Sequence, residues 1–390
     1  MKVIIDDKIP YIKGALESVA RVVYLPGGKI SRDDLMDVDA MIIRTRTKCT
    51  AQLLEGTAVK FIATATIGHD HIDTAYCEKA GIRWTNAPGC NSGSVEQYIV
   101  SALLYLSVKN NFQLKGKTLG VIGVGNVGSK VVRAASVLGC RVLMNDPPRA
   151  DAFIATSDDT GDQGNREAFV SLGKILQEAD IVTVHVPLNR EGKYCTVRLA
   201  DKQFFSQMKQ NTIFINSSRG EVVDQEALKN ALQNGQLADA VLDVFAGEPE
   251  IDRELLDMLA LATPHIAGYS ADGKANGTTM SVQAVSREFG LGLDDWAPGE
   301  VPEPHQKEIF ADGADDDTET LIREVYDATY RISEDHQRLM NDPVAFERLR
   351  GTYPVRREPH AYSARVFNDD GKYREIFENL RFNVIGDSCM

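Results

Sequence analysis

A glycine-rich turn between an apolar strand and an amphipathic helix constrains the fold of this chain more than any other feature. The apolar run Thr118–Ile122 leads into the turn Gly123–Gly128, which fits G-x-G-x-x-G, and Ser129–Leu138 then has the pattern of a helix. The first glycine permits a tight turn, the second lets a pyrophosphate approach the backbone, and the third allows close packing of helix on strand. The helix N-terminus adds N–H donors and a positive dipole end. The residues expected to bind a dinucleotide here are Gly123, Gly125, Asn126, Val127 and Gly128.

The residue that ends the next strand indicates which dinucleotide is bound. The run Arg141–Asn145 ends at Asp146, about 20 residues beyond the turn. A carboxylate there accepts hydrogen bonds from the ribose hydroxyls and repels a 2′-phosphate, which favours NAD over NADP. An isolated G-x-G-x-x-G is a weak signal that also fits an ordinary glycine turn, but here the flanking strand, helix and acid are all present.

Short runs rich in Val and Ile alternate with helical patterns along the first 265 or so residues. Such runs suit strands that are buried on both faces, and their alternation with helices predicts parallel sheets made of βαβ units. We therefore expect an α/β fold with two doubly wound, Rossmann-like domains and a cleft between them. The predicted strands include Lys2–Ile5, Ala40–Ile43, Phe61–Ala63, Thr118–Ile122, Arg141–Met144, Ile181–Val184, Thr212–Ile215 and Ala240–Leu242.

Two helical patterns, Ser94–Asn110 and residues 268–290, are placed to connect the two sheets. They predict a discontinuous first domain over residues 1–93 and 266–290 and a dinucleotide-binding domain over residues 94–265. The polar, glycine-rich segment Ser157–Asn165 is expected to form a surface loop.

The remaining residues, 291–390, differ in composition and predict a small α+β domain. Residues 297–317 are proline-containing and acidic and are expected to form a linker or an extended arm. Thr320–Met340 and Lys372–Leu380 have helical patterns, and Tyr362–Phe367 and Phe382–Ile385 have strand patterns. The segment has no evident constellation of catalytic side chains, so a structural role such as subunit association is favoured over a catalytic one.

The composition excludes several classes of protein. The 390 residues carry a formal net charge of −13, which argues against a nucleic-acid binder. The N-terminus lacks the apolar core of a signal peptide, and no run approaches the ~20 apolar residues of a membrane span. We expect a cytoplasmic protein with reduced thiols, because its six cysteines are scattered: Cys49, Cys77, Cys90, Cys140, Cys195 and Cys389.

Three polar residues that follow strands predict a reaction site. Arg219 follows the run Thr212–Ile215, Glu248 lies just beyond Ala240–Leu242, and His265 lies in a Thr-Pro-His segment. Oxidation of a 2-hydroxy acid needs a cation for the carboxylate, a base for the hydroxyl proton, and a group that orients the base. Taken singly, each residue also fits a non-catalytic role, as a surface arginine, a solvated loop carboxylate or a structural histidine. Together and in this order, they indicate catalysis.

In these motifs the sequence resembles the D-isomer-specific 2-hydroxyacid dehydrogenases over roughly residues 1–290. The resemblance implies that Arg219 and Glu248 are active-site residues and that His265 donates or accepts the proton. It also implies NAD contacts at Asp146, Asp243, Gly268 and the backbone near Val186. Val186 stands where this family often has a threonine, which leaves no side-chain hydrogen bond at that position.

Further segments are similar to a branch of this family that oxidises 4-phospho-D-erythronate to 2-oxo-3-hydroxy-4-phosphobutanoate in vitamin B6 biosynthesis. This closer resemblance implies substrate contacts at Thr45, Thr66 and Tyr269. Residues 291–390 resemble, more loosely, the dimerisation domain of that branch and so imply a homodimer. The segments are Asp6–Tyr11, Arg44–Lys48, Thr64–Asp73, Ala87–Asn91, Asp146–Ala150 and His265–Ser270.

A basic cluster supports a phosphorylated substrate independently of the resemblance. Arg44, Arg46 and Lys48 alternate along a strand end and the loop after it, and a period of two places them on one face. We expect Arg44 or Arg46 to bind the phosphate; a solvated basic face is the alternative reading.

The sequence leaves other interpretations open for a metal site, for the substrate and for the class of protein. His69, His71 and Asp73 superficially resemble a metal cluster, but adjacent side chains on an extended segment point apart, so structural roles are favoured and no metal is predicted. The substrate could be another D-2-hydroxy acid, such as 3-phosphoglycerate. A protein that senses NAD without turnover is a rival of another class, although sensing alone needs no proton acceptor such as His265.

Overall fold

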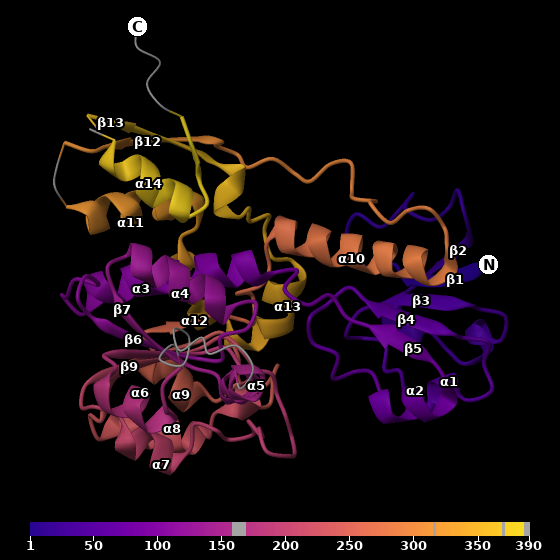
Figure 1. The fold of residues 1–390 in the computed structure, drawn as a ribbon, viewed down its shortest axis with the longest axis horizontal. Coiled ribbons are helices and arrows are strands. Elements are labelled where there is room, and N and C mark those ends of the chain that lie inside the picture. Colours follow the sequence, from indigo (N-terminus) through magenta and orange to yellow (C-terminus); the bar gives the residue numbers. More distant parts are fainter. Residues whose placement is uncertain (158–168, 315–316, 369–370, 386–390) are drawn as a thin grey trace, which may run out of the picture. The chain divides into compact units, whose positions relative to one another are not determined.

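The computed structural model describes residues 1–157, 169–314, 317–368 and 371–385 (Figure 1). All but the first residue of the predicted loop Ser157–Asn165 lies outside the described residues. The chain divides into two compact units. The first contains Met1–Ser92 and Tyr269–Glu303, and the second contains Gly93–Gly268 and the chain from Pro304 onward. A separate C-terminal domain over residues 291–390 stays a prediction.

The first unit contains a five-stranded parallel sheet in the order β2-β1-β3-β4-β5. Apolar side chains from alternate positions of its strands pack against α10 on one face and against α1 and α2 on the other. This two-sided burial explains the uninterrupted apolar runs in the sequence. The elements are β1 (Lys2–Asp6), β2 (Arg21–Leu25), β3 (Ala40–Ile43), α1 (Ala51–Leu54), β4 (Phe61–Thr64), α2 (Thr74–Ala80), β5 (Arg83–Thr85) and α10 (Ala271–Phe289).

The second unit contains a six-stranded parallel sheet in the order β11-β10-β9-β8-β6-β7. The strand order reverses between β6 and β8, and ligands of open α/β sheets bind at the carboxyl ends of strands beside such a reversal. The strands are β6 (Thr118–Ile122), β7 (Arg141–Asn145), β8 (Ile181–Val184), β9 (Thr212–Asn216), β10 (Leu237–Leu242) and β11 (Leu261–Ala262).

Helices cover both faces of this sheet (Figure 1). One apolar cluster of the unit joins the sheet to α6, α7, α8 and α9 on one face, whereas α4 packs on β6 and β7 from the other. The helices are α3 (Ser92–Lys109), α4 (Gly128–Val137), α5 (Pro147–Ser157), α6 (Leu172–Glu178), α7 (Lys202–Gln207), α8 (Gln225–Gln233) and α9 (Arg253–Met258). The predicted fold class, α/β with two parallel doubly wound sheets, is confirmed.

The C-terminal residues form a third, smaller parallel sheet in the order β12-β13-β14. Helices α11 and α14 contact it, and α14 also packs on α4. The elements are β12 (Glu308–Asp312), α11 (Thr318–Thr329), α12 (Ile332–Asn341), α13 (Phe346–Gly351), β13 (Ser363–Phe367), α14 (Lys372–Asn379) and β14 (Asn383–Val384).

Two local predictions for this region are wrong. Part of the expected linker, Glu308–Asp312, is a strand, because Ile309 and Ala311 turn into the core of the small sheet while the alternate residues of the strand are exposed. The expected single helix Thr320–Met340 is broken at Tyr330, whose backbone is extended and whose hydroxyl bonds to Asp335. In the described part of the chain, no helix has the length and hydropathy needed to span a membrane.

Candidate active site

The three glycines of the turn between β6 and α4 have different environments. Gly123 has a φ of +86°, and a Cβ there would lie 2.6 Å from the His185 carbonyl oxygen. A Cβ on Gly128 would lie 2.0 Å from the Gly123 carbonyl oxygen. A Cβ on Gly125, by contrast, would have no atom of the described residues within 4 Å, apart from those of its own chain neighbours. The first and third glycines are therefore required by the fold itself, whereas the second leaves open space in front of the backbone.

The surroundings of this turn fit a bound NAD. Val127, the N-cap residue of α4, has an apolar side chain that cannot cap the helix N-terminus, so it does not compete with a phosphate for the N–H groups there. Asp146 accepts hydrogen bonds from Val124 N (2.8 Å) and Arg149 N (3.1 Å), one on each carboxylate oxygen. Each oxygen keeps a second lone pair for a ribose hydroxyl. Val186, just after β8, borders the turn, since a Cβ on Gly123 would lie 2.9 Å from its side chain.

The three residues predicted for the reaction follow three neighbouring strands. Arg219 lies just after β9, Glu248 follows β10 and His265 follows β11. Because these strands are parallel, their carboxyl ends share one edge of the sheet, which is also the edge of the glycine turn.

Glu248 and His265 are in direct contact. His265 Nδ1 lies 2.7 Å from Glu248 Oε2, and the other carboxylate oxygen accepts from Phe245 N at 2.8 Å. Burial raises the pKa of the Glu248 carboxyl, but the hydrogen bonds from His265 and Phe245 outweigh it and hold the pKa below its ordinary value. A carboxylate only accepts, so Nδ1 of the imidazole carries the hydrogen and the neutral ring keeps its lone pair on Nε2. The pair therefore presents Nε2 as a proton acceptor.

The backbone around Arg219 packs tightly against the loop that carries Glu248. A Cβ on Gly220 would lie 2.0 Å from the carbonyl carbon of Phe245, so only glycine fits there. The Asn216 side chain donates to the Arg219 carbonyl oxygen at 2.9 Å, and Arg219 Nη1 donates to the Ser218 carbonyl oxygen at 2.8 Å. These contacts fix the loop at the carboxyl end of β9.

Asp243 has a structural role that the sequence did not indicate. Its side chain is 1% exposed and accepts hydrogen bonds from Thr263 Oγ1 (2.6 Å), Ile266 N (2.7 Å) and Ala267 N (2.9 Å). Burial raises the pKa of this carboxyl to about 6. Asp243 thus anchors the loop on both sides of His265; its contact with NAD stays a prediction.

The basic cluster of the first unit lies on a turn and not on a strand. β3 ends at Ile43, and Thr47 N bonds to the Arg44 carbonyl oxygen at 3.1 Å, so the period-two argument for a shared face is wrong. Arg44 Nη1 donates to the Lys8 carbonyl oxygen at 3.0 Å, while Thr45 and Arg46 are exposed. The residues nevertheless lie at the carboxyl end of β3, beside the reversal of strand order between β1 and β3.

Thr66 and Tyr269, the other predicted substrate contacts, also belong to the first unit. Thr66 Oγ1 donates to the Gly68 carbonyl oxygen at 2.9 Å and lies 2.8 Å from Thr64 Oγ1. The Tyr269 ring lies under the Lys274 ammonium at 5.0 Å.

The two histidines of the sequence motif have separate partners. His71 Nε2 lies 3.0 Å from Thr64 Oγ1, and the His69 ring packs on Trp84 at 4.9 Å. Within the described ranges, no group of three or more His, Cys, Asp or Glu residues is arranged to hold a metal ion.

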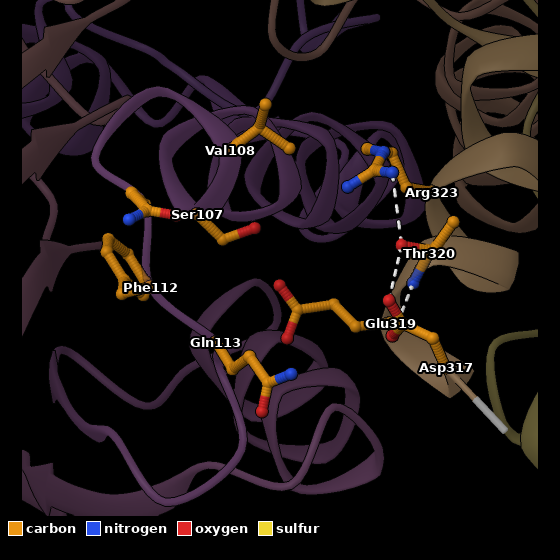
Figure 2. A pocket seen from close by; sticks show the side chains of 9 residues that line it. Ser107, Val108, Phe112, Gln113, Asp317, Glu319, Thr320 and Arg323 are labelled. Carbon is orange, nitrogen blue, oxygen red and sulfur yellow. Dashed lines mark hydrogen bonds between the residues drawn. The ribbon is translucent and has the colours of Figure 1, made fainter.

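A pocket of about 350 Å³ lies elsewhere in the second unit, where the end of α3 meets the start of α11 (Figure 2). Its polar groups bond mainly to one another: Arg323 donates to Thr320 Oγ1, which donates to Asp317. Glu319 accepts from Leu114 N at 2.7 Å. None of the predicted site residues lines this pocket, and we assign it no ligand.

Comparison with known proteins decides the family. Residues 105–267 match the family model "D-isomer specific 2-hydroxyacid dehydrogenase, NAD binding domain". The chain is 51% identical over 364 residues to the erythronate-4-phosphate dehydrogenase of Bacteroides thetaiotaomicron, covering 93% of this chain and 99% of that protein. It is 37% identical over 386 residues to the Yersinia enterocolitica protein of the same name, covering 98% and 99%.

The chain belongs to the erythronate-4-phosphate dehydrogenase family. This family lies within the D-isomer-specific 2-hydroxyacid dehydrogenases. A crystal structure of D-lactate dehydrogenase from Aquifex aeolicus, complexed with NAD and lactic acid, superposes with a TM-score of 0.61 at 25% identity, covering 75% of this chain and 97% of that one. Membership confirms the predicted enzyme class and the NAD-binding domain.

Proposed function

We propose that this member of the erythronate-4-phosphate dehydrogenase family oxidises 4-phospho-D-erythronate to 2-oxo-3-hydroxy-4-phosphobutanoate with NAD, as a step of vitamin B6 biosynthesis. The observation that carries the proposal is the Glu248–His265 pair, held at 2.7 Å on the sheet edge that also bears Arg219 and the glycine turn. The names of the relatives supply the substrate.

The chemistry follows from the donor and acceptor atoms. The Arg219 guanidinium, a planar bidentate donor, binds the substrate carboxylate. His265 Nε2 accepts the proton of the C2 hydroxyl, and the Glu248 carboxylate stabilises the imidazolium that forms. The glycine turn and Asp146 would hold NAD, which would supply the acceptor for the hydride from C2. Asp243, Gly268 and the Val186 backbone complete the proposed cofactor contacts.

The phosphate end of the substrate is assigned to the first unit. We propose that Arg44 or Arg46 binds the phosphate and that Thr45, Thr66 and Tyr269 contact the rest of the substrate. Support comes from the exposed turn at the carboxyl end of β3, which carries cationic side chains in a protein with a net charge of −13.

A substrate panel tests the reaction. Purified protein with NAD should form NADH faster with 4-phospho-D-erythronate than with 3-phosphoglycerate or D-lactate. His265→Ala should lower kcat by about 10²–10⁴-fold, the usual contribution of a general base. Turnover at the wild-type rate in that variant would refute the role of His265. NAD binding without turnover of any 2-hydroxy acid would favour the rival NAD sensor.

The phosphate assignment has its own variants. Arg44→Ala and Arg46→Ala should raise KM for 4-phospho-D-erythronate, since each removes a cation from the turn. Arg21→Ala, an exposed change at the amino end of β2, is the control and should leave KM unchanged. The assignment is wrong if neither Arg44→Ala nor Arg46→Ala changes KM.

We also propose that the chain is a cytoplasmic homodimer that associates through its C-terminal sheet. Phe310 and Phe367 on β12 and β13 are 54% and 41% exposed, and their rings stack at 5.9 Å. An exposed aromatic pair on a small sheet is typical of an association surface. No disulfide bond joins the cysteines of the described residues, in keeping with a reducing compartment.

A further inference from the structure

The loop that carries His265 is held by side chains from two distant parts of the chain. On one side, Asp243 accepts the N–H groups of Ile266 and Ala267. On the other, Arg356 Nη2 donates to the carbonyl oxygens of the same two residues, at 3.2 and 2.6 Å. The N–H and the C=O of both residues that follow the histidine are therefore hydrogen-bonded to side chains.

The conformation of His265 makes such anchoring necessary. Its φ is +57°, in the left-handed region that residues other than glycine rarely adopt. A residue in this region keeps its conformation only when the surrounding structure enforces it. The hydrogen bonds at Ile266 and Ala267 supply this constraint directly after the histidine.

Arg356 lies between α13 and β13 and is only 4% exposed. Its guanidinium lies 4.4 Å from the centre of the Tyr330 ring and 5.7 Å from that of Tyr353. Both tyrosine hydroxyls donate to Asp335, at 3.0 and 2.6 Å, which fixes the orientation of the rings. Aromatic faces held in this way stabilise a buried cation.

The chemistry of this site argues against a role in packing alone. Nε and Nη1 of Arg356 are buried and find no hydrogen-bond partner among the described residues, so Nη2 makes the hydrogen bonds of this guanidinium that the described structure contains. A buried cation pays a desolvation penalty that an apolar residue of similar volume avoids. The bonds that such a residue cannot replace are those from Nη2 to the two loop carbonyls.

We propose that Arg356 is a positioning residue that holds the His265 loop in its catalytic conformation. The inference rests on the proposed role of His265 as the base, but the hydrogen bonds themselves do not depend on which 2-hydroxy acid is the substrate. Arg356 acts through the loop backbone and does not contact the substrate. The C-terminal part of the chain thereby contributes to catalysis.

Three variants test the proposal. Arg356→Met keeps a long apolar side chain and loses both carbonyl bonds, and Arg356→Lys keeps the charge but presents one compact ammonium group. Arg338→Met is the matched control, because Arg338 bonds to the same Asp335 (2.9 Å) and is half-exposed, and no hydrogen bond to the His265 loop is found for it within the described residues.

We expect Arg356→Met to lower kcat by about 10- to 100-fold, since a misplacement of ~1 Å at a catalytic group costs about 10²-fold. Arg356→Lys should lie between Arg356→Met and wild type. The Kd for NAD should stay within about twofold in all variants, and Arg338→Met should keep the wild-type kcat. A residue that only stabilised the fold would lower Tm without this selective loss of kcat.

A measurement without substrate separates this proposal from the proposed reaction. In protein with isotope-labelled histidine, the His265 Nδ1 proton, bonded to Glu248, should give a downfield NMR signal that His265→Gln removes. Arg356→Met and Arg356→Lys should shift or broaden this signal, and Arg338→Met should not. If these changes occur but wild type oxidises no 2-hydroxy acid, the proposed reaction fails while the positioning of the loop stands.

Either of two results overturns the proposal. In the first, Arg356→Lys, which retains the buried charge and so protects against misfolding, has a wild-type kcat and an unchanged NMR signal. In the second, Arg338→Met loses as much activity as Arg356→Met, which would assign the effect to the Asp335 cluster as a whole and not to the two carbonyl bonds.

Discussion

The two nitrogens of the His265 ring have different environments, and this asymmetry determines which of them is available to a substrate. Nδ1 is bonded to Glu248, so in the proposed reaction Nε2 is the nitrogen that exchanges a proton with substrate. The same contact fixes the plane of the ring. Neither effect requires Glu248 to touch the substrate.

Glu248→Gln should therefore lower kcat more than it affects substrate binding. A hydrogen bond to a charged group contributes about 1.5–3 kcal/mol, and its loss from the imidazolium corresponds to ~10- to 100-fold in rate. Steady-state kinetics of the variant measure the effect. Glu250→Gln, an exposed change two residues away, is the control. An unchanged kcat in Glu248→Gln would contradict the assigned role.

His71 should make the stability of the protein depend on pH. Burial lowers the pKa of this imidazole to about 4, whereas in the unfolded chain it is near 6.5. The unfolded state then binds the proton more tightly, so stability is present above pH ~6.5 and is lost as the pH falls toward 4.

At about pH 5 the loss from His71 should be about 2 kcal/mol, from ~1.4 kcal/mol per pH unit below 6.5. Urea unfolding of wild type and of His71→Gln at pH 7 and 5 measures it, and the variant should show the smaller difference. His69→Gln, which replaces an exposed ring, should retain the wild-type dependence. Equal pH dependence in wild type and His71→Gln would rule out the effect.

At the scale of elements, the glycines of the turn between β6 and α4 have different roles: one is needed for folding and another for NAD binding. Gly128→Ala should destabilise the protein by about 3 kcal/mol, because its methyl group would clash with the Gly123 carbonyl oxygen. Gly125→Ala should leave Tm unchanged, since its methyl group would enter open space, but should weaken NAD binding by about 10-fold or more. Thermal melts and NAD titrations distinguish the two, and a Gly125→Ala protein with wild-type affinity would place the pyrophosphate elsewhere.

The sequence predicted elements best where both faces of a strand are buried. The run Thr118–Ile122 coincides with β6, because every side chain in it is buried and the apolar pattern is continuous. In β12 only Ile309 and Ala311 are buried, and five residues are too few to distinguish such a strand from an extended arm. The turn after Ile43 was missed because it depends on a backbone hydrogen bond and not on side-chain pattern.

The candidate site was predicted in part for a similar reason. Arg219 and Glu248 each follow a strand that the sequence predicts, whereas the strand before His265 is the two-residue β11, which was not predicted; the strand order then places all three residues on one edge. Arg356 has no such signal, because its contact with Ile266 joins residues 90 positions apart and its segment has no regular secondary structure. Contacts of this kind arise from tertiary packing, which periodicity does not encode.

For the whole molecule, the proposed dimer predicts the mass of the protein in solution. Phe310→Lys should convert the protein from a species of two chains to one of 42.9 kDa, because a charge would be placed on the aromatic pair of the C-terminal sheet. Light scattering after gel filtration measures the mass. Val344→Lys, at a residue 93% exposed on another element, is the control. A wild-type protein that is monomeric, or a Phe310→Lys protein that is still dimeric, would exclude this surface.

The bonds from Arg356 to the His265 loop have a consequence for how the protein matures during synthesis. Arg356 follows every strand of the two large sheets in the sequence, and domains fold from the N-terminus as the chain emerges. The sheet that carries Arg219, Glu248 and His265 can thus form before the residue that fixes its reactive loop exists. Nascent chains stalled before residue 356 should retain NAD while they turn over substrate poorly, so the enzyme gains its cofactor before its full catalytic power.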